Sequence, residues 1–442
     1  LLKGLDFEEA TVAAVALMAL LPARARFYRG SSLLAEQWST GWVVAVAVAI
    51  GTSVWLGFFA YRHVEYSTDL WWQFEFGGDA PRFLRATVGS VSLALVLAIS
   101  RLFRPARPEP TDPTAEDLDR AASIIARQPI AAANLAVLGD KSLLFNDAGT
   151  AFLMYAIQGR SWVALGDPIG GDADATELAW HFRDLAARQG GWPVFYQVSQ
   201  HHLPIYLEQG LTLAKIGEVA RVALPTFSLE GSGRARFRNW RNACERAGCK
   251  VEVLPAGASD TMLEDLRRVS DEWLAAKRTR EKGFSLGAFS SQYLRHFPIA
   301  VVRQENRVVA FASLFVTEAR NEMSVDLMRY GSDAPPNVMT YLFVQLMLWG
   351  QQQGYHWFDL GMAPLAGLRN RAFAPLWNRV GAFVFRQGEN FYNFKGLREY
   401  KDRFGPVWEP RYLASPGGLV LPFVLTDIAS LIGGGLKGVF AK

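Results

Sequence analysis

Residues 321–362 constrain the fold more than any other stretch, because they join two strand patterns through a helix pattern. Residues 321–330 alternate Val and Met with polar side chains, which is the period of a half-buried strand. Asn337 is a candidate N-cap for an apolar helix over 338–353, and 356–360 resumes as a strand. A helical crossover of this length predicts two parallel strands and therefore an α/β sheet.

Charged side chains on these two strands indicate where a site lies. Asp326 and Arg329 lie on the first strand, and Asp359 lies on the second. Ligands of open α/β sheets bind at the carboxyl ends of parallel strands, so we place the site there. Residues three apart on a strand point to opposite faces unless a β-bulge intervenes, and Asp326 therefore meets Arg329 only if the strand is bulged.

The first 104 residues have the composition of membrane-spanning helices. Residues 40–61 carry no charge over about the 20 residues that one span requires, and 86–103 form a second expected span. The apolar stretch 10–21 is interpreted as the end of an earlier span, because a chain that begins at Leu1 is expected to be a piece of a longer protein. Arginines in the flanking loops predict that the residues after the last span lie on the cytoplasmic side.

The composition changes to that of a soluble α/β protein after a Pro-rich linker at 105–113. A strand, helix and strand pattern at 161–198 repeats the order found at 321–362. This repeat predicts two similar domains in tandem, 114–255 and 256–415, of which the second contains the candidate site.

A mild excess of positive charge suits an anionic partner. The formal net charge is +4, and a basic helix is expected over 234–250. Arg234, Arg238 and Arg241 share one face of that helix and are candidates for binding phosphate. The apolar, Gly-rich tail at 416–442 is expected to pack on the protein or to lie at a membrane surface.

Metal binding is not expected from the sequence. Cys244 and Cys249 have no histidines clustered with them, and we expect ordinary thiols in a reducing compartment. His201 and His202 are adjacent rather than one helical turn apart, and the nearest Glu is distant. We therefore assign no metal ligands.

The order of strand, turn, helix and strand resembles the GCN5-related N-acyltransferase fold, so the fold class is expected to be tandem domains of this type after transmembrane helices. In that fold the turn after the central strand holds the CoA pyrophosphate on successive backbone N–H groups. Here Pro335 and Pro336 remove two of these donors, and the Arg/Gln-x-x-Gly-x-Gly/Ala spacing is absent. No CoA, and no other cofactor, is expected, so the acyl donor is another activated compound.

Three stretches carry a more specific resemblance. They are Val-Asp-Leu-Met-Arg at 325–329, Phe-Asp-Leu-Gly-Met-Ala-Pro-Leu at 358–365, and Tyr-Asn-Phe-Lys-Gly-Leu at 392–397 continuing to Trp-Glu-Pro-Arg-Tyr-Leu at 408–413. Together with the preceding spans they resemble the aminoacyl-phosphatidylglycerol synthases, the family of multiple peptide resistance factor and lysylphosphatidylglycerol synthetase. The resemblance covers about 114–415 and places the spans at the end of a larger membrane flippase domain.

The resemblance implies an enzyme that moves an amino acid from aminoacyl-tRNA to a phosphatidylglycerol hydroxyl on the cytoplasmic side of the cell membrane. The cationic product lowers the negative charge of the surface and confers resistance to cationic antimicrobial peptides. Lysine is favoured over alanine because it gives the larger change of charge. A homo-oligomer is left open.

The resemblance also implies roles for charged residues, although each can equally be a structural partner. Asp326 is expected to receive the α-ammonium or to move a proton, and Arg329 to contact a phosphate or the 3′ end of the tRNA. Lys395 and Lys401 are expected to stabilise an oxyanion or to bind phosphate. The residues assigned to the amino acid or the tRNA are Asp359, Glu281 and Tyr392, and those assigned to lipid-headgroup or tRNA phosphate are Arg234, Arg238 and Arg241.

Two alternatives share this layout. A peptidoglycan-bridge aminoacyltransferase uses the same tandem fold and the same tRNA donor, but its acceptor is a lipid-linked muropeptide. A degenerate acyltransferase pair can instead act as a binding module on the membrane surface without turnover. Exchanging the acceptor in one assay distinguishes the first alternative from transfer to phosphatidylglycerol. The binding module predicts that Asp326→Asn changes no turnover, so a loss of turnover in that variant argues against it.

Overall fold

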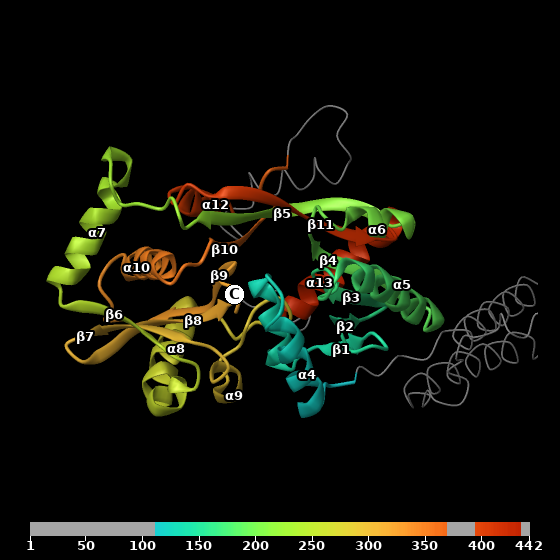
Figure 1. The fold of residues 1–442 in the computed structure, drawn as a ribbon, viewed down its shortest axis with the longest axis horizontal. Coiled ribbons are helices and arrows are strands. Elements are labelled where there is room, and N and C mark those ends of the chain that lie inside the picture. The colour runs from blue at the N-terminus through green and yellow to red at the C-terminus, as the bar shows by residue number, and fades with distance from the viewer. Residues whose placement is uncertain (1–110, 369–393, 435–442) are drawn as a thin grey trace, which may run out of the picture. The chain divides into compact units, whose positions relative to one another are not determined.

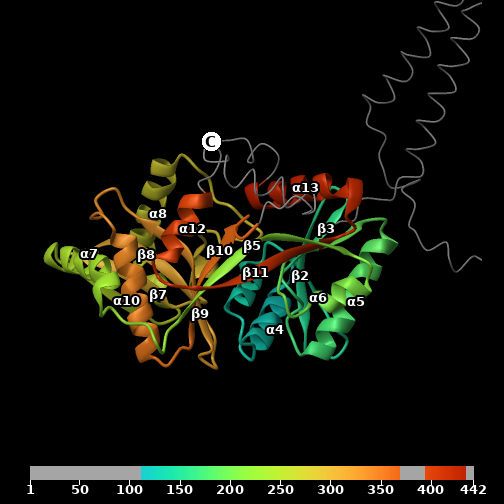
Figure 2. The ribbon, with the colours of Figure 1, turned by 90° about the horizontal axis from the view of Figure 1, so that it is seen from above.

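The computed structural model describes residues 111–368 and 394–434. They contain one mixed sheet of 11 strands in the order β1-β2-β3-β4-β11-β5-β10-β9-β8-β7-β6 (Figures 1 and 2). The expected spans at 10–21, 40–61 and 86–103 lie outside these residues. Within the described part of the chain, no helix has both the length and the apolar character that a membrane crossing needs.

The N-terminal half of the described residues forms five strands of this sheet and the helices that connect them. In order, its elements are α4 (Ala115–Ile125), η3 (Ala131–Leu138), β1 (Ser142–Phe145), β2 (Phe152–Gln158), β3 (Ser161–Leu165), α5 (Asp172–Arg188), β4 (Trp192–Val198), α6 (Leu203–Glu208) and β5 (Thr212–Ala223). The predicted crossover is confirmed, because β3 and β4 pair in parallel on either side of α5.

The C-terminal half continues the sheet. In order, its main elements are α7 (Ala235–Arg246), β6 (Cys249–Leu254), α8 (Leu263–Lys277), α9 (Ser291–Leu294), β7 (Ile299–Gln304), β8 (Arg307–Val316), β9 (Glu322–Tyr330), α10 (Val338–Gln352), β10 (Trp357–Pro364), α12 (Phe394–Asp402), β11 (Val407–Ser415) and α13 (Leu421–Gly433). The strand, helix and strand predicted at 321–362 are confirmed, with β9 parallel to β10.

One local prediction holds in position only, and another is wrong at its end. Asn337 occupies the predicted N-cap position of α10, but its φ is 64° and its side chain makes no capping hydrogen bond. Asn tolerates this left-handed conformation, which leads the chain from the turn into the helix. The basic helix ends at Arg246 rather than at residue 250, since Gly248 has a φ of 81° and the next residues pair as β6 with β7.

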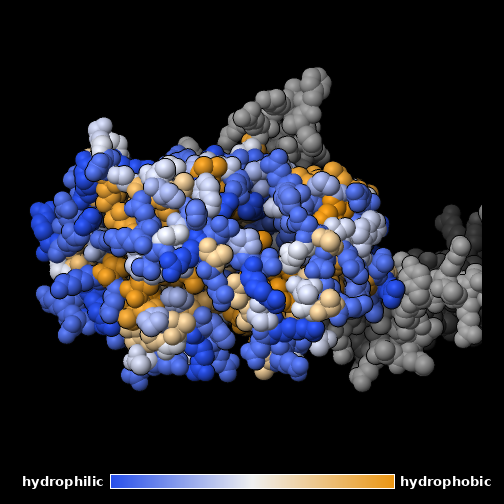
Figure 3. Space-filling model, in the orientation of Figure 1, coloured by the Kyte–Doolittle hydropathy of each residue, from blue (hydrophilic) through white to orange (hydrophobic). Residues whose placement is uncertain are grey.

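Helices cover both faces of the C-terminal half of the sheet. Alternate residues of β7 face opposite sides, so that Ala300 and Val302 join a core with α7 and α10, whereas Val301 joins a core with Leu266 and Val269 of α8. The described part of the apolar tail forms α13, which packs Val424 and Ile428 into another core. Hydrophilic side chains cover much of the face seen in Figure 3, with apolar side chains between them.

Strand β11 lies between β4 and β5, although the sequence places it near the C-terminal end. It runs antiparallel to both neighbours, and it lies along β5 in Figures 1 and 2. At the far edge, β6 pairs with β7, so strands from before and after residue 255 are hydrogen-bonded to one another. The division into two tandem domains at 255 stays a prediction.

Candidate active site

The site is built where β9 and β10 stop pairing. Their parallel ladder joins three residue pairs and ends with Ser324 opposite Asp359. The Ser324 hydroxyl donates to the Asp359 carbonyl oxygen at 3.0 Å, which closes this last rung. Beyond it both strands are irregular against their other neighbours, β8 and β5. Bulges of this kind re-aim side chains and are frequent at functional sites.

A β-bulge in β9 answers the question that spacing alone left open. Asp326 and Leu327 lie opposite the single residue Ser313 of β8. The displaced Leu327 N–H donates to the Ser313 hydroxyl at 3.1 Å, which keeps this buried backbone group satisfied. Because of the extra residue, Asp326 and Arg329 both reach the segment 281–293.

The Asp326 carboxylate is held by two donors from this segment. The Gly287 N–H and the Tyr293 hydroxyl each donate to one of its oxygens at 2.9 Å. A Cβ on Gly287 would overlap the carboxylate, so the close approach requires glycine. Burial raises the pKa of Asp326, and these hydrogen bonds together with the charges of Lys141 and Arg329 oppose that shift.

Arg329 is a buried cation, and one of its donors has no partner in the part of the chain that the structure describes. Its side chain is 7% exposed, its Nη2 lies 2.9 Å from Glu281 Oε2, and its guanidinium lies 4.2 Å from the centre of the Trp273 ring. Within the described residues, Nη1 has no hydrogen-bond partner. A buried unpaired donor on a cation is costly unless an anion or another acceptor joins it.

Lys141 and Asp140 belong to the same group, although the sequence did not indicate them. Lys141 is buried and pairs with Asp140, whose other oxygen accepts from the Phe284 N–H at 2.9 Å. Burial lowers the pKa of Lys141, and the charges of Asp140 and Asp326 oppose that shift. No local pattern marks this pair, because the turn before β1 meets the segment 281–293 only in the folded chain.

Lys401 and Asp359 form a second group on the β10 side. The Lys401 side chain is buried, and its Nζ donates to the carbonyl oxygens of Gly361 and Met362 at 2.9 and 3.0 Å. Gly361 has a φ of 81° and donates its N–H to Asp359 Oδ1 at 2.6 Å. Burial lowers the pKa of Lys401 to about 8, with the Asp359 charge opposing the shift.

Buried and half-buried charges that no sequence pattern indicates lie around this second group. Arg221 bridges Glu322 and Glu409, with Nη2 and Nη1 at 2.9 and 2.8 Å from their oxygens. Burial and the Asp359 charge raise the pKa of Glu322 to about 7. Burial also raises the pKa of Asp359, against the charges of Arg411, Lys401 and Arg221. These groups come from β5, β9, β10 and β11, so only the sheet order brings them together.

The predicted site residues thus fall into two groups. Asp326, Arg329 and Glu281 share one, and Asp359 and Lys401 share the other. The structure describes no hydrogen bond or ion pair that joins the two groups directly. Tyr392 and the side chain of Lys395 lie outside the described residues.

The three arginines predicted to bind phosphate all have partners within the protein. Arg234 donates to the carbonyl oxygens of residues 403 and 404, and Arg238 donates to those of residues 229 and 231. Arg241 pairs with Glu245 at 2.8 Å. The first two contacts fix loops to the ends of α7 and α12, so the role in phosphate binding stays a prediction.

Residues 123–415 match the protein family described as the C-terminal region of phosphatidylglycerol lysyltransferase. A phosphatidylglycerol lysyltransferase of Bacillus subtilis is 38% identical over 305 residues, which are 69% of this chain and 35% of the relative. One from Staphylococcus aureus is 37% identical over 276 residues, which are 62% of this chain and 33% of the relative. The chain therefore spans about a third of the length of the curated relatives it matches.

Two solved structures share the fold. The C-terminal domain named for a lysylphosphatidylglycerol synthetase of Agrobacterium fabrum is 43% identical, with a TM-score of 0.67 over 73% of this chain and 99% of that one. The structure of L-PGS from Bacillus licheniformis is 35% identical, with the same TM-score over 74% of this chain and 99% of that one. The mixed α/β sheet is therefore the one found in these C-terminal domains.

Proposed function

The chain belongs to the family formed by the C-terminal region of phosphatidylglycerol lysyltransferase, and we therefore propose that it transfers a lysyl group to phosphatidylglycerol. The family match over 123–415 carries the proposal. The donor in this proposal is lysyl-tRNA, and the acceptor lies at the cytoplasmic face of the membrane. We also propose that the chain contains two acyltransferase-like domains in tandem and that membrane-spanning helices precede them.

The proposed reaction needs acid–base chemistry rather than a cofactor. The lysyl group of lysyl-tRNA is an activated ester. A glycerol hydroxyl oxygen of phosphatidylglycerol attacks its carbonyl carbon, the bond to the ribose oxygen breaks, and that oxygen leaves with a proton. The site therefore has to hold the donor ammonium groups, accept the hydroxyl proton, and stabilise the oxyanion that forms between the two steps.

Lys401 is suited to accept the proton. A neutral amine has two N–H groups and one lone pair, and the carbonyl oxygens of Gly361 and Met362 account for the two N–H groups. With a pKa of about 8, a useful share of Lys401 is neutral near physiological pH. Once protonated, its third N–H can donate to the oxyanion or to the leaving ribose oxygen.

The Asp326 group is suited to hold the donor. An ionised carboxylate accepts about four hydrogen bonds, and Gly287 and Tyr293 supply two to Asp326, which leaves room for an ammonium. Nη1 of Arg329, which has no partner among the described residues, suits a phosphate of the lipid or of the tRNA 3′ end. Both roles follow from donor and acceptor capacity.

The test follows label from lysyl-tRNA into lipid. The chain is incubated with phosphatidylglycerol vesicles and with tRNA carrying labelled lysine, and the lipid is extracted. We expect labelled lipid that is lost when RNase destroys the donor, little label from alanyl-tRNA, and none when a lipid-linked muropeptide replaces phosphatidylglycerol. Label that survives RNase contradicts the tRNA donor, and label in the muropeptide favours the peptidoglycan-bridge reaction.

A matched pair of variants assigns the activity to the site. Lys401→Gln removes the proposed base, whereas Lys250→Gln removes an exposed lysine of β6. We expect Lys401→Gln to reduce transfer by about 10² to 10⁴-fold, the usual contribution of general acid–base catalysis. Equal activity in the two variants would remove Lys401 from the mechanism.

A further inference from the structure

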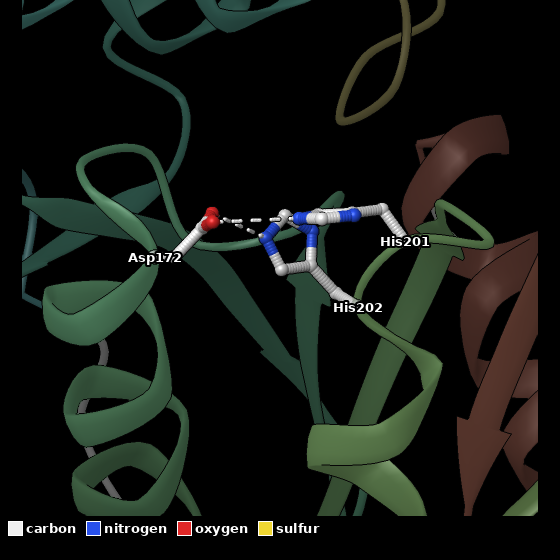
Figure 4. A group of neighbouring side chains, drawn as sticks. All are labelled: Asp172, His201 and His202. Carbon is white, nitrogen blue, oxygen red and sulfur yellow. Dashed lines mark ion pairs between the residues drawn. The ribbon is translucent and has the colours of Figure 1, made fainter.

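A cluster of metal-binding side chains lies at the carboxyl ends of β3 and β4, on elements that the proposed active site does not use. Asp172 is the first residue of α5, which follows β3, and His201 and His202 lie in the connection that follows β4 (Figure 4). Asp172 Oδ2 lies 3.5 Å from His201 Nε2, and its Oδ1 lies 3.6 Å from His202 Nε2. The carboxyl ends of parallel strands are common positions for ligand sites in α/β sheets.

Asp167 orients one of the two imidazoles from behind. Its side chain is 10% exposed, and its oxygens accept from the Ser199 N–H at 2.9 Å and from the Tyr206 hydroxyl at 2.8 Å. His202 Nδ1 lies 3.3 Å from Asp167 Oδ2 and also 3.3 Å from the Ser199 hydroxyl oxygen. When the proton is on Nδ1 and directed at these two oxygens, His202 presents the lone pair of Nε2 toward Asp172.

We propose that Asp172, His201 and His202 bind a divalent transition-metal ion, with zinc as the preferred ion. One ligand atom from each residue lies within 4.8 Å of the other two. An ion bound at about 2.0 to 2.2 Å from each atom needs only small rotations, which Asp172 and His201 can make because they are 80% and 71% exposed. Two imidazoles and a carboxylate suit zinc, and the remaining position is open to water.

The orienting carboxylate distinguishes this cluster from a chance group of surface residues. Metal-binding histidines usually donate their other ring N–H to a carboxylate or a carbonyl, which fixes the ring and raises its affinity for the ion. Asp167 provides this contact and is itself fixed by Ser199 and Tyr206. The only two cysteines, Cys244 and Cys249, are buried in the core and are poorly placed to compete for an ion.

The proposed ion is structural. It adds a second link between the connection before α5 and the connection before α6, which Asp167 already joins by accepting from the Ser199 N–H. An ion that binds the folded chain and not the unfolded chain stabilises the fold by mass action. The site therefore predicts a zinc-dependent gain in stability that does not depend on lipid or tRNA.

The test is a metal titration of the whole chain, purified without a histidine tag and treated with a chelator. Binding of Zn²⁺ is followed by calorimetry, and binding of Co²⁺ by its visible absorption, which reports nitrogen and oxygen ligands. We expect one ion per chain and a higher Tm with Zn²⁺. His201→Ala and Asp172→Asn each change an exposed side chain, so both should fold and lose the ion.

Two more variants make the test specific. Asp167→Asn should weaken binding by about 10 to 100-fold, which is the usual effect of a residue that orients a metal ligand. His181→Ala, which removes an exposed histidine of α5, should leave binding unchanged. Absence of binding to the unsubstituted chain would overturn the proposal, as would binding that persists in both His201→Ala and Asp172→Asn.

Discussion

At the scale of single residues, the chemistry of the candidate site depends on how much solvation each charged group loses on burial. Lys401 loses solvation when it is buried, and the carbonyl oxygens of Gly361 and Met362 replace water only in part. Asp326 loses solvation as well, which raises its pKa, and the donors from Gly287 and Tyr293 oppose that rise. A buried amine and a hydrogen-bonded carboxylate thus provide different chemistry within one sheet.

The pH dependence of transfer tests the role of Lys401. Because only the neutral amine accepts a proton, the single-turnover rate should rise with pH, with a midpoint near the pKa of about 8, and level off above it. Lys401→Arg keeps a permanent charge, so it should lose both the activity and this rise. Spontaneous hydrolysis of the lysyl ester is subtracted at each pH. A similar rise in an active Lys401→Arg variant would contradict the assignment.

Gly287 offers a second test at this scale. An alanine there would place its Cβ against the Asp326 carboxylate and push that side chain away. Displacement by about 1 Å costs on the order of 10² in rate at a catalytic site, so Gly287→Ala should lose about that much activity. Gly233→Ala is the matched control, because a Cβ there meets nothing within 4 Å. Similar activity in both variants would show that the position of Asp326 is unimportant.

At the scale of elements, the bulge in β9 and the left-handed Gly361 in β10 separate two strands that would otherwise continue to pair. The charged side chains of Asp326 and Asp359 lie where this pairing ends. The bulge in β9 removes a ladder hydrogen bond from the Leu327 N–H, and the Ser313 hydroxyl accepts that N–H instead. A side chain of the neighbouring strand therefore supports the shape of the site.

Ser313→Ala measures this support. The substitution leaves the buried Leu327 N–H without an acceptor, which should lower the free energy of unfolding by about 1 to 3 kcal/mol in urea denaturation followed by tryptophan fluorescence. Ser270→Ala is the control, because Ser270 Oγ is buried and has no partner among the described residues. That variant should be neutral or slightly stabilised. An equal loss of unfolding free energy in the two variants would mean that the hydrogen bond to the Ser313 hydroxyl does not stabilise the bulge.

Sequence patterns predicted the elements that local chemistry determines. β9, α10 and β10 follow from alternation, an apolar helix and Gly354, and the structure confirms them. β5 was not predicted, because Lys215, Glu218 and Arg221 are three residues apart, a spacing that alternation does not explain. Their partners include Arg398, Glu322 and Glu409, which come from other elements.

The candidate site divides in the same way. Charged residues at the ends of predicted strands, such as Asp326 and Asp359, are visible in the sequence. The same is not true of Lys141, Tyr293 or Arg221, which join the site through contacts between distant segments. Tertiary pairing decides these positions, and a single sequence contains no periodicity that reports it.

At the scale of the whole described part, β11 unites the two halves of the sheet. It fills the position between β4 and β5, while β5 also pairs with β10. Residues 111–255 alone would lack the partner that joins β4 to β5, and they would also lack the partner of β6. The halves are therefore expected to depend on each other for folding.

Fragment complementation tests this dependence. A fragment of residues 111–255 should show no cooperative unfolding and poor dispersion of its amide NMR signals. Addition of residues 256–434 should restore both, because it supplies β11, β10 and β7. A mixture with fragment 256–405, which lacks β11, is the control and should not restore them. Cooperative folding of 111–255 alone would show that the first half is an independent domain.

The position of β11 also sets an order in time. Ribosomes add about 5 to 20 residues per second, so roughly 10 to 40 s separate the synthesis of β5 from that of β11. Until then β4 and β5 each expose an unpaired edge, which is a template for pairing with another chain. A nascent chain of this kind needs protection during synthesis, and premature termination before residue 407 should yield aggregates rather than a smaller folded protein.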